Sequence, residues 1–207
     1  MSASKKEKKT ETARCPWAGA DPLYQHYHDT EWGVPHADDQ RLFEKIVLEG
    51  FQAGLSWITI LRKRENFRRA FHGFDAKKIV RYTDRDIARL MADEGIIRNR
   101  LKIEATISNA AAYLKLKETG TLSAFLWKAI GKRPAATARR AIGDIPAITD
   151  EAVKLSKALK KAGFRFVGPA SMYAFMQSTG MVNDHLAGCH RHAPCVELQQ
   201  KFRVPAG

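Results

Sequence analysis

Apolar residues recur along this chain at three- and four-residue spacing, the period at which side chains share one face of a helix. No segment alternates convincingly between apolar and polar residues, which is the pattern of a half-buried strand. We therefore predict an all-α protein. Spacing, capping residues and glycine stops predict helices over about 39–49, 57–71, 84–92, 98–117, 122–130, 150–162 and 169–179.

Individual residues predict where the first two of these helices begin and end. Asp38 or Asp39 can cap the first helix, because a side-chain oxygen there accepts from the free N–H groups of the first turn. Gly50 is placed to stop this helix, since glycine is the usual residue just past a helix end. Ser56 can cap the second helix in the same way as the aspartates.

The last two predicted helices enclose a turn with a glycine at each end. Gly163 ends the first helix, which Thr149 caps, and Gly168 precedes a proline at the favoured first position of the second. The N–H groups that begin the second helix can hold a phosphate, and positive charge nearby comes from Lys157, Lys160, Lys161 and Arg165. The alternative is an ordinary antiparallel helix pair, in which glycine is only the commonest cap.

Composition is that of a globular protein, and charge favours a polyanionic partner. Of 207 residues, 44% are apolar and 28% charged, so a core can form and wholesale disorder is excluded. Lys and Arg number 35 against 22 Asp and Glu, a formal net charge of +13. No apolar run reaches the ~18 residues of a membrane span, and the N-terminal lysines lack the apolar stretch of a secretory signal. We expect a cytoplasmic protein that does not bind membranes.

Two segments are predicted to lie outside the helices. Residues 1–14 are polar and charged, and we expect a disordered basic tail there. Residues 131–148 contain glycine, proline and several basic residues, which is typical of a loop and suits one that faces phosphate.

The cysteines indicate metal binding more than disulfides. An odd number of thiols without an export signal argues against a disulfide framework. Cys15 and His28 lie near the N-terminus, and His185 and Cys189 at i and i+4 share one helical face. Two ligands from each end would form a four-ligand structural zinc site that ties the ends of the chain together. The residues alone leave this open, because isolated thiols and histidines need no metal, and competing ligands are present at His190, His192 and Cys195.

Glu49 breaks the local pattern. It falls on the apolar face of its predicted helix and near the C-terminal end, where a negative charge opposes the helix dipole. A carboxylate held against apolar walls can accept hydrogen bonds from a ligand or stabilise nearby positive charge. Clustering of Glu49 and Trp57 with Tyr24 and Tyr27, which lie beside His28, favours a functional role. The alternative is that Glu49 lies at a frayed helix end and pairs with Lys45, while Trp57 is an ordinary core residue.

Six blocks of sequence, in collinear order, carry a family resemblance. They are CPW (15–17), DPLYQHYHDTEWGVP (21–35), LFEKIVLEGFQAGLSWITIL (42–61), GIIRNRLKI (95–103), KALKKAGFRFVGP (157–169) and VNDHLAGC (182–189). Together they closely resemble the 3-methyladenine DNA glycosylase I family, over about residues 14–190. The resemblance implies a helix-hairpin-helix glycosylase that excises N3-methylated adenine from double-stranded DNA in base excision repair. It would be monofunctional and monomeric, and associated with the nucleoid through DNA.

Carried over residue by residue, the resemblance assigns three sets of site residues. One structural Zn²⁺ would be bound by Cys15, His28, His185 and Cys189. The base pocket would consist of Tyr27, Glu49 and Trp57, with Glu49 also the candidate catalytic residue. The hairpin would grip DNA through Lys160, Lys161, Gly163, Arg165 and Gly168. We expect a glycosylase domain over residues 15–190 and a C-terminal extension over 191–207.

Three positions depart from the wider superfamily. Phe166 stands where the usual hairpin has glycine, and Ala170 where strand-cutting relatives carry a lysine that forms a Schiff base. Asn183 aligns with the usual catalytic aspartate, with Asp184 one position away. Phe166 implies fewer backbone donors for phosphate, whereas the changes at positions 170 and 183 argue against lyase chemistry and for unusual catalytic machinery.

Two other functions fit fewer of the sequence features. One is a zinc-stapled DNA-binding protein without catalysis. The other is a zinc hydrolase with an open ligand position and Glu49 as general base.

Overall fold

The computed structural model describes residues 12–131 and 138–205, and these residues form helices and turns without a strand. The all-α prediction is confirmed for this part of the chain. Three short 3-10 turns, η1 (Pro16–Ala18), η2 (His72–Phe74) and η3 (Ile142–Asp144), accompany the α-helices. The α-helices are α1 (Pro22–Thr30), α2 (Asp39–Gln52), α3 (Trp57–Ala70), α4 (Ala76–Ile79), α5 (Asp84–Ala92), α6 (Arg100–Leu116), α7 (Leu122–Ile130), α8 (Asp150–Lys161), α9 (Pro169–Ser178) and α10 (His192–Lys201).

Several helix starts follow from the capping residues in the sequence. The side chain of Asp38 accepts from Arg41 N at the start of α2, and Thr149 accepts from Ala152 N at the start of α8. Ser56 precedes α3 as predicted, although its hydroxyl contacts Thr59 Oγ1 and caps no backbone N–H. Side-chain caps therefore begin α2 and α8 as the sequence predicted, whereas the predicted side-chain cap by Ser56 is wrong.

The prediction that Gly50 stops α2 is wrong, because the helix continues to Gln52. A Cβ added at Gly50 would lie 3.2 Å from Phe166 Cβ, so glycine lets the α8–α9 turn approach the helix backbone. The end of α2 is instead capped by Lys102, whose ammonium donates to the carbonyl oxygens of Phe51 and Ala53 at 2.9 and 2.8 Å. Glu49 is consequently held inside the helix, one turn from its end.

Helices α1, α4 and α10 are absent from the prediction. Helix α10 lies in the segment expected to be an extension, and it packs on the body of the protein. Cys195 and Gln199 are buried, and the Gln199 amide donates to Gly180 O at 2.8 Å. Its weak amphipathic pattern and Pro194 in its first turn explain why periodicity did not reveal it.

Parts of both predicted non-helical segments can be described. Residues 1–11 of the expected tail lie outside the described residues, whereas Arg14 pairs with Asp29 at 2.7 Å. Residues 132–137 of the expected loop also lie outside them. Within the rest of that loop, Arg139 pairs with buried Asp184 at 2.8 Å, which ties the loop to the segment after α9.

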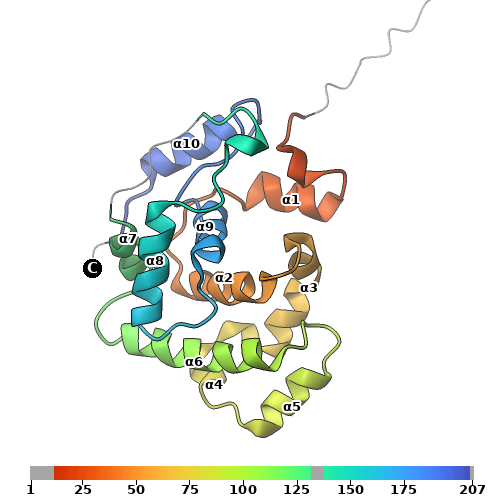
Figure 1. The fold of residues 1–207 in the computed structure, drawn as a ribbon, viewed down its shortest axis with the longest axis vertical. Helices are drawn as coiled ribbons and strands as arrows, with labels where there is room; N and C mark the ends of the chain where they lie inside the picture. The colour runs from red at the N-terminus through yellow and green to blue at the C-terminus, as the bar shows by residue number, and fades with distance from the viewer. Residues whose placement is uncertain (1–11, 132–137, 206–207) are drawn as a thin grey trace, which may run out of the picture.

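Helix α2 lies at the centre of the fold and packs against α3, α6, α7 and α9 (Figure 1). Helices α8 and α9 form the antiparallel pair beside it, while α4, α5 and α6 lie at the opposite end of the view from α1 and α10. Within the described residues, every helix is too short or too polar to cross a bilayer. The arrangement brings α1, the end of α2, the start of α3 and α9 together around the site described next.

Candidate active site and metal cluster

A cavity of about 190 Å³ contains all three residues predicted to form a base pocket. Tyr27 comes from α1, Glu49 from α2 and Trp57 from the first position of α3. The Tyr27 and Trp57 rings lie 5.5 Å apart, centroid to centroid, and are tilted by 42°. Positions separated by 30 residues thus meet at one hollow, because α1 and α3 both flank the end of α2.

Glu49 is almost fully buried at this cavity, with 3% of its surface exposed. Its Oε1 forms an ion pair with Lys45 Nζ at 3.4 Å and lies 3.5 Å from Ser178 Oγ, whose hydroxyl donates to Phe175 O at 2.9 Å. Its Oε2 is buried and has no hydrogen-bond partner among the described residues. Burial raises the pKa of Glu49, which Lys45 partly opposes. The predicted alternative was right about the Lys45 pair but wrong about a frayed end.

Trp57 and Tyr27 each have one side-chain polar atom, and the hydrogen bonding of the two atoms differs. Trp57 Nε1 is buried and lacks a partner among the described residues. Tyr27 Oη accepts a hydrogen bond from Lys45 Nζ at 2.9 Å, and burial raises the pKa of Tyr27 well above 10. A buried polar atom without a partner costs free energy, so Trp57 Nε1 and Glu49 Oε2 are suited to a ligand that supplies the missing partners.

The other residues of this cavity, apart from Tyr24, were not singled out from the sequence. Trp17 and Trp32 form part of its wall, and their rings lie 4.9 Å apart, edge to face. The remaining lining residues are Tyr24, Gln52, Ile145, Ala174, Gln177 and Ser178. Only the density of aromatic residues between positions 17 and 32 signalled part of this wall in the sequence. The contribution of α9 and of the loop before α8 depends on tertiary contacts.

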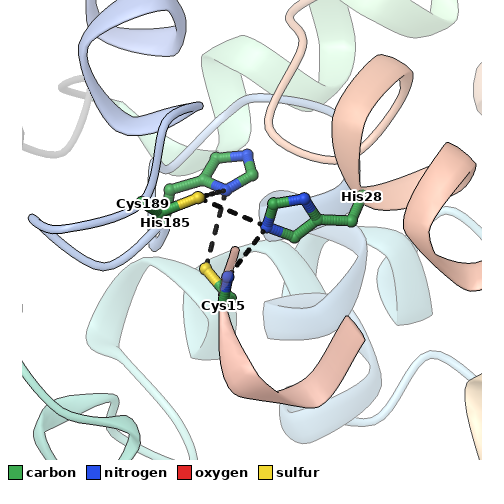
Figure 2. A group of neighbouring side chains, drawn as sticks. All are labelled: Cys15, His28, His185 and Cys189. Carbon is green, nitrogen blue, oxygen red and sulfur yellow. Dashed lines mark hydrogen bonds between the residues drawn. The ribbon is translucent and has the colours of Figure 1, made fainter. Parts of the chain in front are cut away.

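The four predicted metal ligands lie together at the end of the molecule near α1. Figure 2 shows Cys15, His28, His185 and Cys189 pointing toward one another from segments at the two ends of the chain. All four are buried, and their candidate ligand atoms lie within 4.8 Å of one another. This group could hold a metal ion. The competing residues do not join it, since His190 contacts Ala13 O and Cys195 lies near Arg191.

Each histidine of the cluster uses its second ring nitrogen elsewhere. His28 Nδ1 contacts Asp29 Oδ1 at 2.7 Å, and His185 Nε2 contacts the Trp32 carbonyl oxygen at 3.0 Å. A hydrogen bond from the outer nitrogen fixes the ring and leaves the inner nitrogen as a lone-pair donor, the arrangement typical of metal-binding histidines. The contact between the two thiols raises the pKa of Cys15 and lowers that of Cys189.

The turn between α8 and α9 has a glycine near each end, as the sequence predicted. Gly163 adopts φ +97° after α8, and Gly168 is the residue before Pro169 at the start of α9. Phe166 stands at the position where the usual hairpin has glycine. It is 37% exposed and adopts φ +56°, a conformation that glycine favours. Asn109 of α6 braces the turn: Arg165 N donates to its Oδ1 at 2.7 Å, and its Nδ2 donates to Arg165 O at 3.1 Å.

The positions that depart from the superfamily pattern are also well defined. Ala170 is exposed at the start of α9, so no amine stands there. Asn183 is buried and bonds His192 O and His185 N, which makes it a brace of the cluster segment. Asp184 is buried among Arg139, Tyr173 and Gln177. Neither Asn183 nor Asp184 lines the cavity of Glu49.

Comparisons with known proteins agree with this site. The methyladenine glycosylase family model matches residues 17–192. The chain is 51% identical over 177 residues to DNA-3-methyladenine glycosylase 1 of Escherichia coli K12, covering 85% of this chain and 95% of the relative. A crystal structure of 3-methyladenine DNA glycosylase I matches with a TM-score of 0.83 and 49% identity, over 86% of this chain and 98% of the other.

A second structure is a tyrosine-to-phenylalanine variant of 3-methyladenine DNA glycosylase I in complex with 3-methyladenine. It matches with a TM-score of 0.81 and 38% identity, over 86% of this chain and 96% of that one. The family model spans the residues that line the cavity, the turn between α8 and α9 and all of the Cys/His cluster except Cys15. The chain belongs to the methyladenine glycosylase family.

Proposed function

We propose that this protein is a DNA-3-methyladenine glycosylase, which hydrolyses the N-glycosidic bond of N3-methylated adenine in alkylated DNA. The observation that carries the proposal is the buried Glu49 with one unpartnered oxygen at an aromatic-walled cavity. Relatives of the same family are named for this activity, and one was solved with 3-methyladenine bound.

The cavity suits an electron-poor base. N3-methylated adenine is cationic in DNA and departs as a neutral base, so its bond is already weakened and little acid catalysis is required. The enzyme must extrude the nucleotide from the stack, which costs a few kcal/mol, and recognise the base. Trp57 would stack on the ring, where attraction between a cation and an aromatic face contributes ~0.5–2 kcal/mol. Tyr27 and the free Glu49 oxygen would hydrogen-bond its edge.

Glu49 acts first in base recognition and second in catalysis. Loss of the base leaves positive charge on the sugar until water captures it, and a nearby carboxylate stabilises that charge. Ala170 offers no amine to attack the sugar, so Schiff-base chemistry and strand cleavage are not expected. The enzyme is therefore monofunctional in this proposal.

We assign one structural Zn²⁺ to the Cys15, His28, His185 and Cys189 cluster. Ligand atoms placed tetrahedrally at about 2.0–2.3 Å from zinc lie about 3.3–3.8 Å apart. The distances from Cys189 Sγ to His28 Nε2 and His185 Nδ1 are 3.4 and 3.5 Å, and Cys15 Sγ lies 3.7 Å from His185 Nδ1. Four protein ligands leave no position for substrate, so the ion would join the ends of the chain and take no part in the reaction.

The hairpin is the proposed DNA-binding element, in a helix-hairpin-helix arrangement that grips one strand of the duplex. The N–H groups at the start of α9 and the positive charges of Lys160, Lys161 and Arg165 suit phosphate, while Gly163 and Gly168 permit close approach. The net charge of +13 supports a DNA partner. We infer a monomer that works in the cytoplasm on the nucleoid, with residues 15–190 as the glycosylase domain and 191–207 as an extension.

Replacing both Lys160 and Lys161 with Gln is expected to weaken DNA binding and flatten its salt dependence. Each lost phosphate contact lowers the slope of log Kd against log salt by about 0.9. Fluorescence anisotropy with duplex DNA across salt concentrations measures the slope. The matched control is Lys77→Gln with Lys78→Gln, an adjacent exposed lysine pair on α4, which should keep the wild-type slope. Equal slopes for both double variants would place the DNA contact elsewhere.

Release of free bases from methylated duplex DNA tests the function directly. Chromatography should detect 3-methyladenine, with strands left intact until an added lyase or alkali cuts them. A folded, metal-loaded protein that binds DNA but releases no base would contradict the proposal and favour the non-catalytic DNA-binding alternative. A chelator that stops the reaction while leaving the melting temperature unchanged would favour the zinc hydrolase.

A further inference from the structure

Lys45 contacts all three residues assigned to the base pocket without lining the cavity that they share. It lies on α2 one turn before Glu49, with 13% of its side chain exposed. Its Nζ is 2.9 Å from Tyr27 Oη, 3.4 Å from Glu49 Oε1 and 3.4 Å from the centroid of the Trp57 ring. The ammonium thus lies behind the aromatic wall, beside a separate hollow of about 50 Å³.

Burial of an ammonium here is costly unless its three N–H groups are used. An uncharged side chain of similar length, such as methionine, would fill the same space without that cost. The contacts to Tyr27, Glu49 and Trp57 compensate the charge, and they orient those three side chains in return. The presence of a lysine at position 45 is therefore better explained by its effect on the pocket side chains than by packing.

The direction of the Lys45–Tyr27 hydrogen bond has a consequence for the pocket. An ammonium only donates, so Tyr27 Oη must accept this bond. The phenol still has its own proton, which is then left to donate on the cavity side. For Glu49, the ammonium pairs with Oε1, and Oε2 is left without a partner among the described residues. One donor and one acceptor are thereby presented to the cavity.

We propose that Lys45 is a positioning residue that sets the hydrogen-bond polarity of the base pocket, holding Tyr27 as a donor and the second Glu49 oxygen as an acceptor for the base. This inference rests on the proposed pocket of Tyr27, Glu49 and Trp57. The edge of an adenine carries both ring-nitrogen acceptors and an amino donor. A fixed donor next to a fixed acceptor matches such an edge.

Deprotonation of Lys45 should reverse this polarity. A neutral amine can accept, so the Tyr27 proton can turn away from the base toward Lys45 Nζ. Burial, followed by Arg64, lowers the pKa of Lys45 to about 8, against the opposing effects of Glu49 and Glu31. The other charged or titratable groups around the small hollow are His36, Arg41, Glu44 and Arg68, and burial lowers the pKa of His36 to about 4. The rate should fall above pH ~8, whereas Tyr27 titrates far higher.

A double-mutant cycle between Lys45→Met and Tyr27→Phe tests the proposal. Loss of one charge-assisted hydrogen bond should reduce kcat/KM for base release about tenfold in each single variant. The double variant should be little worse than Tyr27→Phe alone, because Lys45 orients this donor through the Tyr27 hydroxyl, which Tyr27→Phe already removes. Lys45→Met should also lack the fall in rate above pH ~8. Lys117→Met is the matched control, since it removes an exposed lysine whose Nζ lies 5.6 Å from the Tyr113 ring centroid, outside the site.

The outcomes separate the proposal from the pocket on which it rests. Multiplicative effects in the cycle, or an alkaline fall that persists in Lys45→Met, would overturn the role of Lys45. If the single variants Tyr27→Phe and Glu49→Gln both kept full activity, the proposed pocket itself would be overturned. If Lys45→Met does not fold, the wild-type enzyme still decides: an unchanged rate up to pH 9.5, with an unchanged melting temperature, contradicts the proposal.

Discussion

Glu49→Gln is expected to lower kcat/KM for 3-methyladenine release by about 10²- to 10³-fold while the protein folds normally. The carboxylate is buried at the cavity, and positive charge is present on the base before cleavage and on the sugar during it. Removing one preorganised electrostatic partner of a transition state typically costs rate by this factor. Glutamine keeps the size of the side chain and one acceptor oxygen, so the decrease in kcat/KM measures the contribution of the negative charge.

Single-turnover base release on methylated duplex DNA measures this effect, and binding of free 3-methyladenine measures recognition separately. Glu44→Gln is the matched control, because Glu44 lies on the same helix and pairs with Arg68 outside the cavity of Glu49. It should retain wild-type rates. A Glu49→Gln enzyme with undiminished release would remove Glu49 from both proposed roles. Weaker base binding with an unchanged cleavage rate on bound substrate would confine it to recognition.

Glu49→Gln should also change the pH dependence of the rate of base release. Burial raises the pKa of Glu49 above 4.5. The carboxylate therefore loses its charge at a higher pH than an exposed glutamate as acid is added, and the wild-type rate should fall there. Glu49→Gln has no such group and should lack this acid limb. An identical acid limb in both proteins would assign it to another residue.

Cys189→Ala is expected to abolish metal binding and to lower the melting temperature by about 10–20 °C. Structural zinc contributes several kcal/mol to folding, and a chain of this size loses about 2–4 °C per kcal/mol. The cluster joins the segment before α1 to the segment after α9, and the cavity is lined nearby by Trp17 in η1, Trp32 just after α1 and Gln177 in α9. Base release should therefore decline together with the folded fraction.

Metal content by elemental analysis and thermal unfolding by circular dichroism check this result. Cys195→Ala is the matched control, because Cys195 is an equally buried thiol that lies outside the cluster. It should retain one zinc per chain and lose only the stability of a small core truncation. A Cys189→Ala protein with full zinc content would exclude Cys189 as a ligand.

The sequence determined the helical class and several boundaries because these depend on neighbouring residues. Helical periodicity, the caps at Asp38 and Thr149 and the glycine after α8 all act within one or two turns. The same reasoning failed at Gly50, because its role is a contact with Phe166 more than 100 residues away. Helix α10 was missed for a similar reason, since it is held by buried contacts such as Gln199 with Gly180.

For the site as well, the sequence indicated some of the chemistry and the tertiary structure decided the rest. Glu49 was visible in the sequence as a charge on an apolar face, and the thiols and imidazoles were visible as candidate ligands. Only the tertiary structure decided which four of seven Cys and His candidates meet, that one Glu49 oxygen lacks a partner, and that Lys45 joins Tyr27, Glu49 and Trp57. Residue type fixes what a side chain can donate or accept, whereas its partner is set by the packing of helices that are distant in sequence.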